Sequence, residues 1–145
     1  MKELASNKKA FFDYEIIDKF IAGIELTGHE AKSIKMGRVN IVGSHAIIRG
    51  NELYLVGMDV PAFQPRNAPA DYDSQRTRKL LMKREEIKNL FGKTQTGLTV
   101  LPLKIYTDRG LVKAELGLGR GRKKHDKREV LKKRETDREI RGFRK

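Results

Sequence analysis

Basic side chains crowd the last stretch of the chain, and the chemistry open to them is the binding of a polyanion. Residues 120–145 hold 13 Lys and Arg against 5 Asp and Glu, a net charge of +8 out of +13 for the whole protein. Their few large apolar residues cannot offset the entropy of ordering a free segment of this length. A basic arm of this kind is typical of nucleic-acid binding, and the alternative is a merely solubilising tail.

Side chains suited to catalysis or to metal binding are sparse. There is no cysteine, and the histidines at positions 29, 45 and 125 lie in unrelated segments, which argues against thiol chemistry and against zinc. A small nuclease would have to bind metal through Asp71, Asp73, Glu85 and Glu86. The first two lie in a loop, and adjacent helical residues such as the last two diverge by about 100°. We therefore expect no enzyme, no catalytic residue, no metal and no cofactor.

Composition narrows the class of partner. The isoelectric point is near 10.1, which favours RNA, DNA or an anionic membrane surface. No apolar run approaches the roughly 20 residues that cross a bilayer, and the first residues lack a signal-peptide apolar region. A membrane-surface helix needs a broad apolar face, whereas the tail offers only isolated apolar residues. We expect a cytoplasmic protein without a membrane partner.

Strand and turn signals alternate along the body. Residues 11–18 are partly alternating and rich in aromatic and β-branched side chains, and residues 20–27 continue as a second strand or past a bend. Gly50-Asn51 and Gly110 each suit the tight turn of a β-hairpin. Pro102 cannot donate to a strand ladder, so it should lie at an edge or a bulge. The two predicted hairpins join residues 44–48 to 53–58 and residues 98–106 to 111–118.

Helices are predicted to be few and short. Residues 28–37 have glycine at both ends and apolar residues at helical spacing, and residues 83–91 form a second helix that Gly92 should stop. The proline-rich residues 61–74 read as a surface loop, residues 79–82 are ambiguous, and residues 117–121 suit a hinge.

These elements predict a mainly β fold. It is a small closed antiparallel β-barrel resembling the OB-fold, with two or three short helices and a basic C-terminal tail. A split α+β sandwich fits the composition almost as well. We expect an RNA-binding β-barrel domain over residues 1–118 and a tail over residues 119–145 that is disordered when free.

Five segments in order resemble the SmpB (small protein B) family: residues 7–10, 20–37, 76–81, 97–106 and 116–128. They include Phe20-Ile-Ala-Gly-Ile-Glu-Leu-Thr-Gly-His-Glu-Ala-Lys-Ser-Ile-Lys-Met-Gly37, Arg76-Thr-Arg-Lys-Leu-Leu81 and His125-Asp-Lys-Arg128. The resemblance implies a non-enzymatic adaptor, here expected to be a monomer. It would bind the tRNA-like domain of tmRNA and enter the vacant A site of a stalled ribosome for trans-translation. The tail would contact small-subunit rRNA at the decoding centre, lie in the empty mRNA channel and become helical there.

The family's RNA-contacting positions map onto this chain residue by residue. In the first region Lys32 would bind phosphate, and Glu30 would accept from base edges or a 2′-hydroxyl, or would merely favour the start of a helix. In the second region three cations within four residues would clamp phosphates. Leu81 would rest against a base or ribose, or belong to the core. The predicted tmRNA-binding residues are Asn7, Lys8, Lys9, Gly23, Glu30, Lys32, Ser33, Arg76, Arg78, Lys79, Leu81 and Lys83.

The tail is predicted to bind the ribosome. His125 would stack on a ribosomal base, and the last apolar residues would anchor the tail in the channel. Three positions depart from the family pattern: Ile21 replaces an acidic residue, Lys83 a histidine or asparagine, and Thr136 lies near a common tryptophan. The predicted ribosome-binding residues are Arg120, Arg122, Lys123, Lys124, His125, Asp126, Lys127, Arg128, Ile140 and Phe143.

Overall fold

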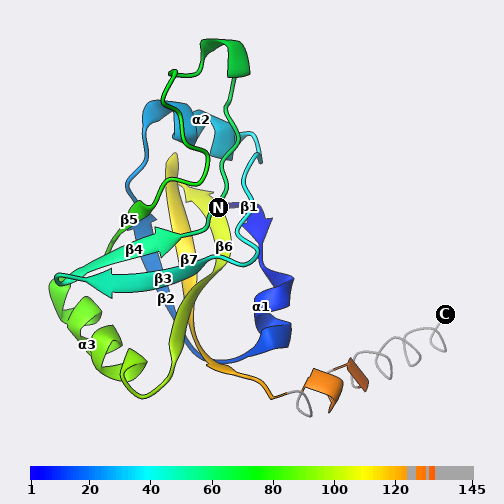
Figure 1. Ribbon diagram of the computed structural model, residues 1–145, viewed down its shortest axis with the longest axis vertical. Coiled ribbons are helices and arrows are strands. Elements are labelled where there is room, and N and C mark those ends of the chain that lie inside the picture. Colours follow the sequence, from blue (N-terminus) through cyan, green and yellow to red (C-terminus); the bar gives the residue numbers. More distant parts are fainter. Residues whose placement is uncertain (124–126, 130, 133–145) are drawn as a thin grey trace.

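Strands dominate the computed structural model, which describes residues 1–123, 127–129 and 131–132. The described residues form seven strands, three α-helices and a short 3-10 turn (Figure 1). In chain order they are β1 (Lys2–Ser6), α1 (Lys8–Asp13), β2 (Tyr14–Ile24), α2 (Gly28–Lys35), β3 (His45–Arg49), β4 (Glu52–Val56), the 3-10 turn (Pro65–Asn67), β5 (Arg78–Leu81), α3 (Arg84–Thr94), β6 (Thr99–Asp108) and β7 (Leu111–Gly121). The fold is mainly β, as predicted. No helix among these residues is long and apolar enough to cross a membrane.

All strand pairs are antiparallel, and the pairing order is β1-β6-β3-β4-β5-β2-β7. Strand β6 also pairs with β7, so the pairings that leave β6 through β3, β4, β5, β2 and β7 return to β6. Figure 1 shows the β3–β4 hairpin lying across the front of the long strands β2 and β7. This arrangement places β2 beside β5, two strands that are far apart in the sequence.

Both predicted hairpins are confirmed, and their turns explain why. Gly50 and Asn51 have φ values of 55° and 69°, and Arg109 and Gly110 have 52° and 80°. Two consecutive left-handed residues make the type I′ geometry that matches strand twist. Pro102 lies at a register shift of the β6–β7 ladder, so its missing N–H falls at an irregularity, also as predicted.

Two apolar clusters hold the helices on the sheet. The larger one fills the inside of the sheet, where α2 contributes Ile34 and α3 contributes Ile87 and Leu90. The smaller one lies under α1, where Ala10 packs on Leu101 and Leu103 of β6. Strand β6 therefore contributes side chains to both clusters and forms the surface on which α1 packs.

Several predicted boundaries were wrong. Residues 11–13 were predicted as strand but belong to helix α1, because Asn7 caps the first turn of that helix. The two predicted strands, residues 11–18 and 20–27, are one continuous strand, β2, which begins at Tyr14 and ends at Ile24. Helix α3 runs through Gly92 to Thr94, and the chain turns only at Gly97, where φ is 92°. Strand β1 was not predicted. The ambiguous residues 79–82 mostly form β5.

The predicted hinge at residues 117–121 is part of strand β7, paired with β2 and β6. A Cβ at Gly117 would lie 2.9 Å from Leu103 Cδ1, and one at Gly119 would lie 2.9 Å from Tyr14 Cβ. These glycines therefore permit close packing of β7 rather than flexibility. Body structure extends past residue 118, and Lys124, His125, Asp126, Ile140 and Phe143 of the predicted tail site lie outside the described residues.

Candidate RNA-binding surface

The pairing of β2 with β5 brings the first and second predicted regions together. Gly23 lies opposite Leu81, and a Cβ on Gly23 would come within 3.3 Å of Leu81 Cβ. Ile21, two residues along β2, points to the same outer side, and both Ile21 and Leu81 are 50% exposed. These three residues form an exposed apolar surface with bare backbone at its centre, which we call the β2–β5 ledge.

Three lysines accompany the ledge, of which Lys79 is half-buried and Lys83 and Lys32 are exposed. Lys79 lies on β5 two residues before Leu81 and is ion-paired with Glu52 at 3.3 Å. Lys83 is exposed at the N-cap position of α3, and Lys32 is exposed on α2. Leu81 is therefore not a core residue here, and it lies among cations that can reach phosphate.

Arg78 is fully buried and all of its described partners are inside the protein. Its Nε donates to Glu30 Oε2 at 2.6 Å, Nη1 donates to the Met58 and Arg76 carbonyls, and Nη2 donates to the Ser74 carbonyl. Its side chain is 0% exposed. This geometry leaves Arg78 with no surface to offer phosphate, contrary to the sequence prediction of a three-cation clamp.

Glu30 is likewise buried and works inside the protein. Its Oε1 accepts from Arg76 Nη2 at 2.6 Å and from the Thr27 N–H at 3.0 Å, completing a capping box at the start of α2. Base edges cannot reach this carboxylate, so the helix-start interpretation was the right one. Arg76 remains 42% exposed and keeps one side toward solvent.

Hydrogen-bond donors stabilise the ionised form of the Glu30 carboxylate. Burial alone would raise its pKa, but the hydrogen bonds from Arg76, Thr27 and Arg78 and the Arg78 charge outweigh burial and lower the pKa from 4.5 to about 2. Burial also raises the pKa of Tyr72, and the negative charge of Glu30 adds to that rise.

Two more predicted contact residues are structural. Ser33 is buried, and its hydroxyl donates to the Pro61 carbonyl at 2.5 Å, which ties α2 to the following loop. Asn7 is buried, and its amide donates to the carbonyls of Pro102 at 3.0 Å and Ile41 at 3.4 Å. Neither side chain is exposed to RNA, and sequence spacing alone could not reveal such distant partners.

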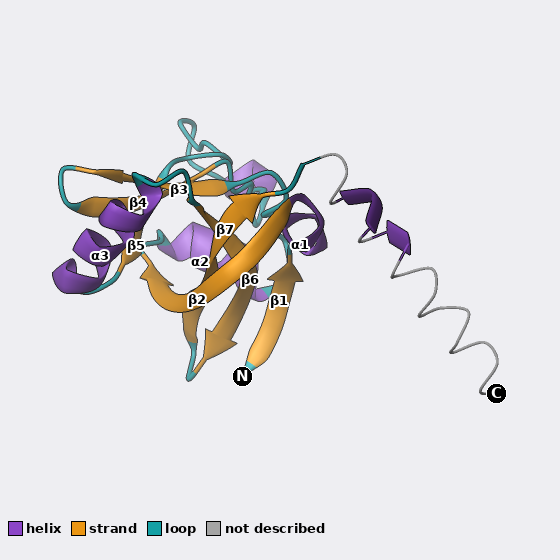
Figure 2. Ribbon diagram, turned by 90° about the horizontal axis from the view of Figure 1, so that it is seen from below, coloured by secondary structure: helices purple, strands orange, loops and turns teal. Residues whose placement is uncertain are grey.

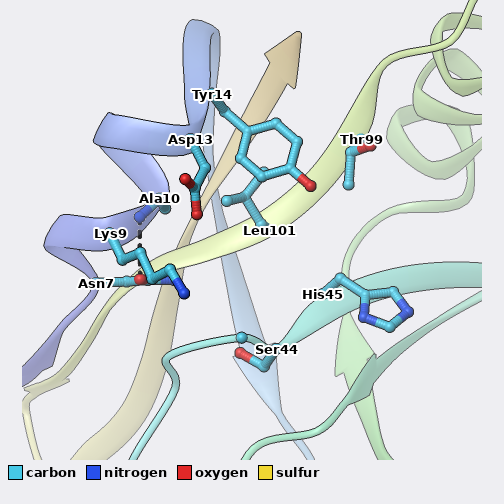
Figure 3. A pocket seen from close by; sticks show the side chains of 10 residues that line it. Asn7, Lys9, Ala10, Asp13, Tyr14, Ser44, His45, Thr99 and Leu101 are labelled. Carbon is cyan, nitrogen blue, oxygen red and sulfur yellow. Dashed lines mark hydrogen bonds between the residues drawn. The ribbon is translucent and has the colours of Figure 1, made fainter. Parts of the chain in front are cut away.

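The exposed Lys8 and Lys9 of the N-terminal cluster lie on α1, which Figures 1 and 2 both place on the opposite side of the molecule from β5. Lys9 lines a cleft of about 310 Å³. In Figure 3, Asp13 and Tyr14 share its wall, and Ser44 and His45 face them. Sequence reasoning missed this cleft because His45 read as an isolated residue and nothing linked it to α1.

The C-terminal segment leaves the body beside this cleft. The Arg122 N–H donates to the Asp13 carbonyl at 2.8 Å, and Lys127 Nζ lies 3.2 Å from Asp13 Oδ1 and 5.9 Å from the centre of the Phe12 ring. Residues 127–129 and 131–132 have helical backbone. Arg120 and Lys123 are exposed, as are Arg128 and the end of β7 at Gly121, so positive charge continues from the body into the segment.

The carboxylates that a metal-dependent nuclease would need do not form a metal-binding cluster among the described residues. Within the ranges that the structure describes, no three His, Asp or Glu side chains are placed to share a metal ion. Glu85 and Glu86 lie in the first turn of α3, where their negative charges stabilise the helix by interacting with the positive end of its dipole.

Comparisons with known proteins show the family of the chain. A family model described as "SmpB protein" matches residues 4–145. The chain is 48% identical over 141 residues to the "SsrA-binding protein" of Synechococcus elongatus, which covers 97% of this chain and 92% of the relative. It is 47% identical over 137 residues to the "SsrA-binding protein" of Cupriavidus pinatubonensis, which covers 94% of this chain and 91% of the relative. A solved structure described as "tmRNA-SmpB: a journey to the center of the bacterial ribosome" aligns with a TM-score of 0.68 and 40% identity over 88% of this chain and 93% of that one. The chain belongs to the SmpB family.

Proposed function

We propose that this protein is the RNA-binding adaptor of trans-translation, acting in the cytoplasm without enzymatic activity. It binds the tRNA-like domain of tmRNA and delivers it to the A site of stalled ribosomes, so that the nascent chain is tagged. The observation that carries this proposal is the family match across almost the whole chain, at 44–48% identity to proteins called SsrA-binding.

The arrangement of exposed residues supports a division of labour. The β2–β5 ledge, with Lys32, Arg76, Lys79 and Lys83, is the tmRNA surface, where an unstacked base or ribose rests on apolar side chains and cations bind phosphate. The α1 cleft and the C-terminal segment form the ribosomal side, in contact with small-subunit rRNA at the decoding centre and with the mRNA channel. The sequence predicts Lys8 and Lys9 as tmRNA contacts, and we propose to move them to this side because α1 contacts the C-terminal segment and lies away from β5. We assign residues 124–126, Ile140 and Phe143 to this side from the family resemblance alone.

The finer fold assignment is also a proposal. The return of the strand pairings to β6 supports a closed barrel of the OB type, with residues 1–121 as the RNA-binding body. The remaining residues form the basic tail. Residues 127–129 and 131–132 already have helical backbone, and we propose that the rest of the tail becomes helical on the ribosome.

A charge-matched pair of double variants tests the tmRNA surface. K79Q/K83Q removes two cations beside the ledge, while K2Q/K104Q removes two exposed cations from β1 and β6. We expect K79Q/K83Q to weaken binding of the tRNA-like domain. It should also reduce the slope of log K against log salt by about 0.7–0.9 for each phosphate that the protein no longer neutralises. K2Q/K104Q should leave both nearly unchanged. Equal losses in the two variants would mean that only net charge matters and would contradict the proposed surface.

A further inference from the structure

The loop between β4 and β5 rises over α2 at one end of the molecule (Figure 1) and is fastened to that helix. The Phe63 N–H donates to His29 Nε2 at 2.9 Å, and Arg38 Nη1 donates to the Phe63 carbonyl at 3.0 Å. Both sides of the Phe63 backbone are therefore held by residues of α2 or of the chain just after it. A proline-rich loop that could have been mobile is held in one position at Phe63.

Aromatic contacts fix the ring as well as the backbone. His29 meets Phe63 edge to face at 6.4 Å between ring centres and meets Tyr72 in the same manner at 4.9 Å. The Tyr72 hydroxyl donates to the Val60 carbonyl at 2.5 Å, which closes the base of the loop. Phe63 is only half-buried in this cluster. The ring is thus pre-positioned and still partly open to solvent.

An open pocket of about 450 Å³ lies against Phe63. None of the five residues that line it is acidic, and its two arginines are both exposed. Aromatic and apolar walls suit the face of a nucleobase, and guanidinium groups suit the phosphates on either side of it. An uncharged aliphatic partner would gain nothing from the two arginines at the rim, whereas the phosphates of RNA would bind them. The lining residues are Arg38, Phe63, Gln64, Pro65 and Arg66.

The pocket continues the charge of the proposed tmRNA surface. Lys32 and Lys35 are exposed on α2, and the exposed Arg38 follows the helix toward the loop. An RNA strand that crosses α2 would therefore meet a row of phosphate-binding side chains that ends at the pocket.

We propose that this pocket captures one unstacked nucleobase of the bound RNA, with Phe63 as the stacking platform and Arg38 and Arg66 bound to the flanking phosphates. This inference rests on the proposed function, since it extends the RNA that lies on α2. It adds a base-binding site about 40 residues along the chain from Gly23, in a loop that family motifs do not mark.

Tryptophan fluorescence offers a direct test, because the chain has no tryptophan. F63W places a single indole at the pocket, and F91W places one at a half-exposed phenylalanine of α3 as the control. Titration with the tRNA-like domain should quench the F63W fluorescence, because a stacked base quenches indole, and should leave F91W nearly unchanged. Unchanged F63W fluorescence at saturating RNA would overturn the proposal.

Affinity measurements provide the second arm. F63L keeps apolar bulk but removes the stacking ring. Alanine substitution of a stacking aromatic weakens binding about 5- to 150-fold, and F63L should weaken it toward the lower end of that range. R66Q, in an exposed side chain outside the core, should weaken binding and flatten the salt dependence. The matched controls F91L and R49Q should stay within about twofold of wild type. Binding by F63L and R66Q that equals these controls would refute the pocket.

The two proposals fail in different ways. If wild type binds the tRNA-like domain no better than an unrelated RNA of equal size, the proposed function is wrong. If wild type discriminates and K79Q/K83Q weakens binding while F63L and R66Q do not, only the pocket is wrong. Urea unfolding of each variant shows whether a loss of binding reflects a loss of folding.

Discussion

At the residue scale, the ion pair with Glu30 keeps Arg78 buried, whereas the neighbouring Arg76 remains partly exposed. Its two charges are removed from water, and they are tolerated because each is satisfied by several hydrogen bonds. Arg76 shares the carboxylate while remaining partly exposed. The pair joins α2 to β5, so it holds together the two segments that carry the proposed tmRNA surface.

Removing one partner should be costly because it leaves the other charge buried without compensation. We expect R78M to destabilise the protein by about 3–5 kcal/mol. R76M removes a half-exposed partner and leaves Arg78 in place, so its loss should be about 1 kcal/mol or less. Urea unfolding of both variants measures the difference. Similar losses from the two substitutions would contradict the structural role given to Arg78.

The depressed pKa of Glu30 makes part of the stability pH-dependent. Because the pKa falls from 4.5 to about 2 on folding, the contribution is fully present above about pH 5 and is lost as the pH falls toward 2. E30Q should be less stable at neutral pH, and its unfolding free energy should fall less steeply than that of wild type between about pH 5 and pH 3. Parallel curves for the two proteins would rule out this source of acid sensitivity.

At the element scale, β7 depends on glycines for its packing. G119A should destabilise the protein by about 1–3 kcal/mol, because the added Cβ meets Tyr14 Cβ, which cannot rotate away. G117A meets Cδ1, Cγ and Cδ2 of the fully buried Leu103 at 2.9–3.2 Å and should also destabilise the protein. G121A is the control, since nothing lies within 4 Å of its added Cβ. Thermal unfolding distinguishes the three, and equal melting temperatures for G119A and G121A would show that β7 does not require the glycine.

The same elements show how far sequence reasoning reaches. Local signals were sufficient for α2 and for both hairpins, because capping and left-handed turn residues act within a few positions. Residues 11–13 of helix α1 were wrongly predicted as the start of a strand because Phe11 and Phe12 favour strands, whereas the contacts that fix the helix join Asn7 to Pro102, 95 residues away. The burial of Arg78 likewise depends on Glu30, 48 residues earlier. Charge and spacing marked the proposed RNA-binding segments but could not separate their solvent-accessible cations from the buried Arg78.

At the scale of the whole molecule, the two proposed surfaces lie apart. The β2–β5 ledge is on one side, and the α1 cleft with the start of the C-terminal segment is on the other (Figures 1 and 2). An adaptor that must hold tmRNA and contact the ribosome at once requires such a separation. We therefore expect the body to recognise tmRNA without help from the basic tail.

Paired binding titrations would show whether the body suffices for recognition. Full-length protein and a version ending at Lys123, which keeps β7 whole, are titrated at one stated salt concentration with the tRNA-like domain and with an unrelated structured RNA of similar size. We predict that both proteins bind the tRNA-like domain selectively and that truncation removes mainly the nonspecific component. Equal binding of the two RNAs by full-length protein, abolished by truncation, would contradict recognition by the body.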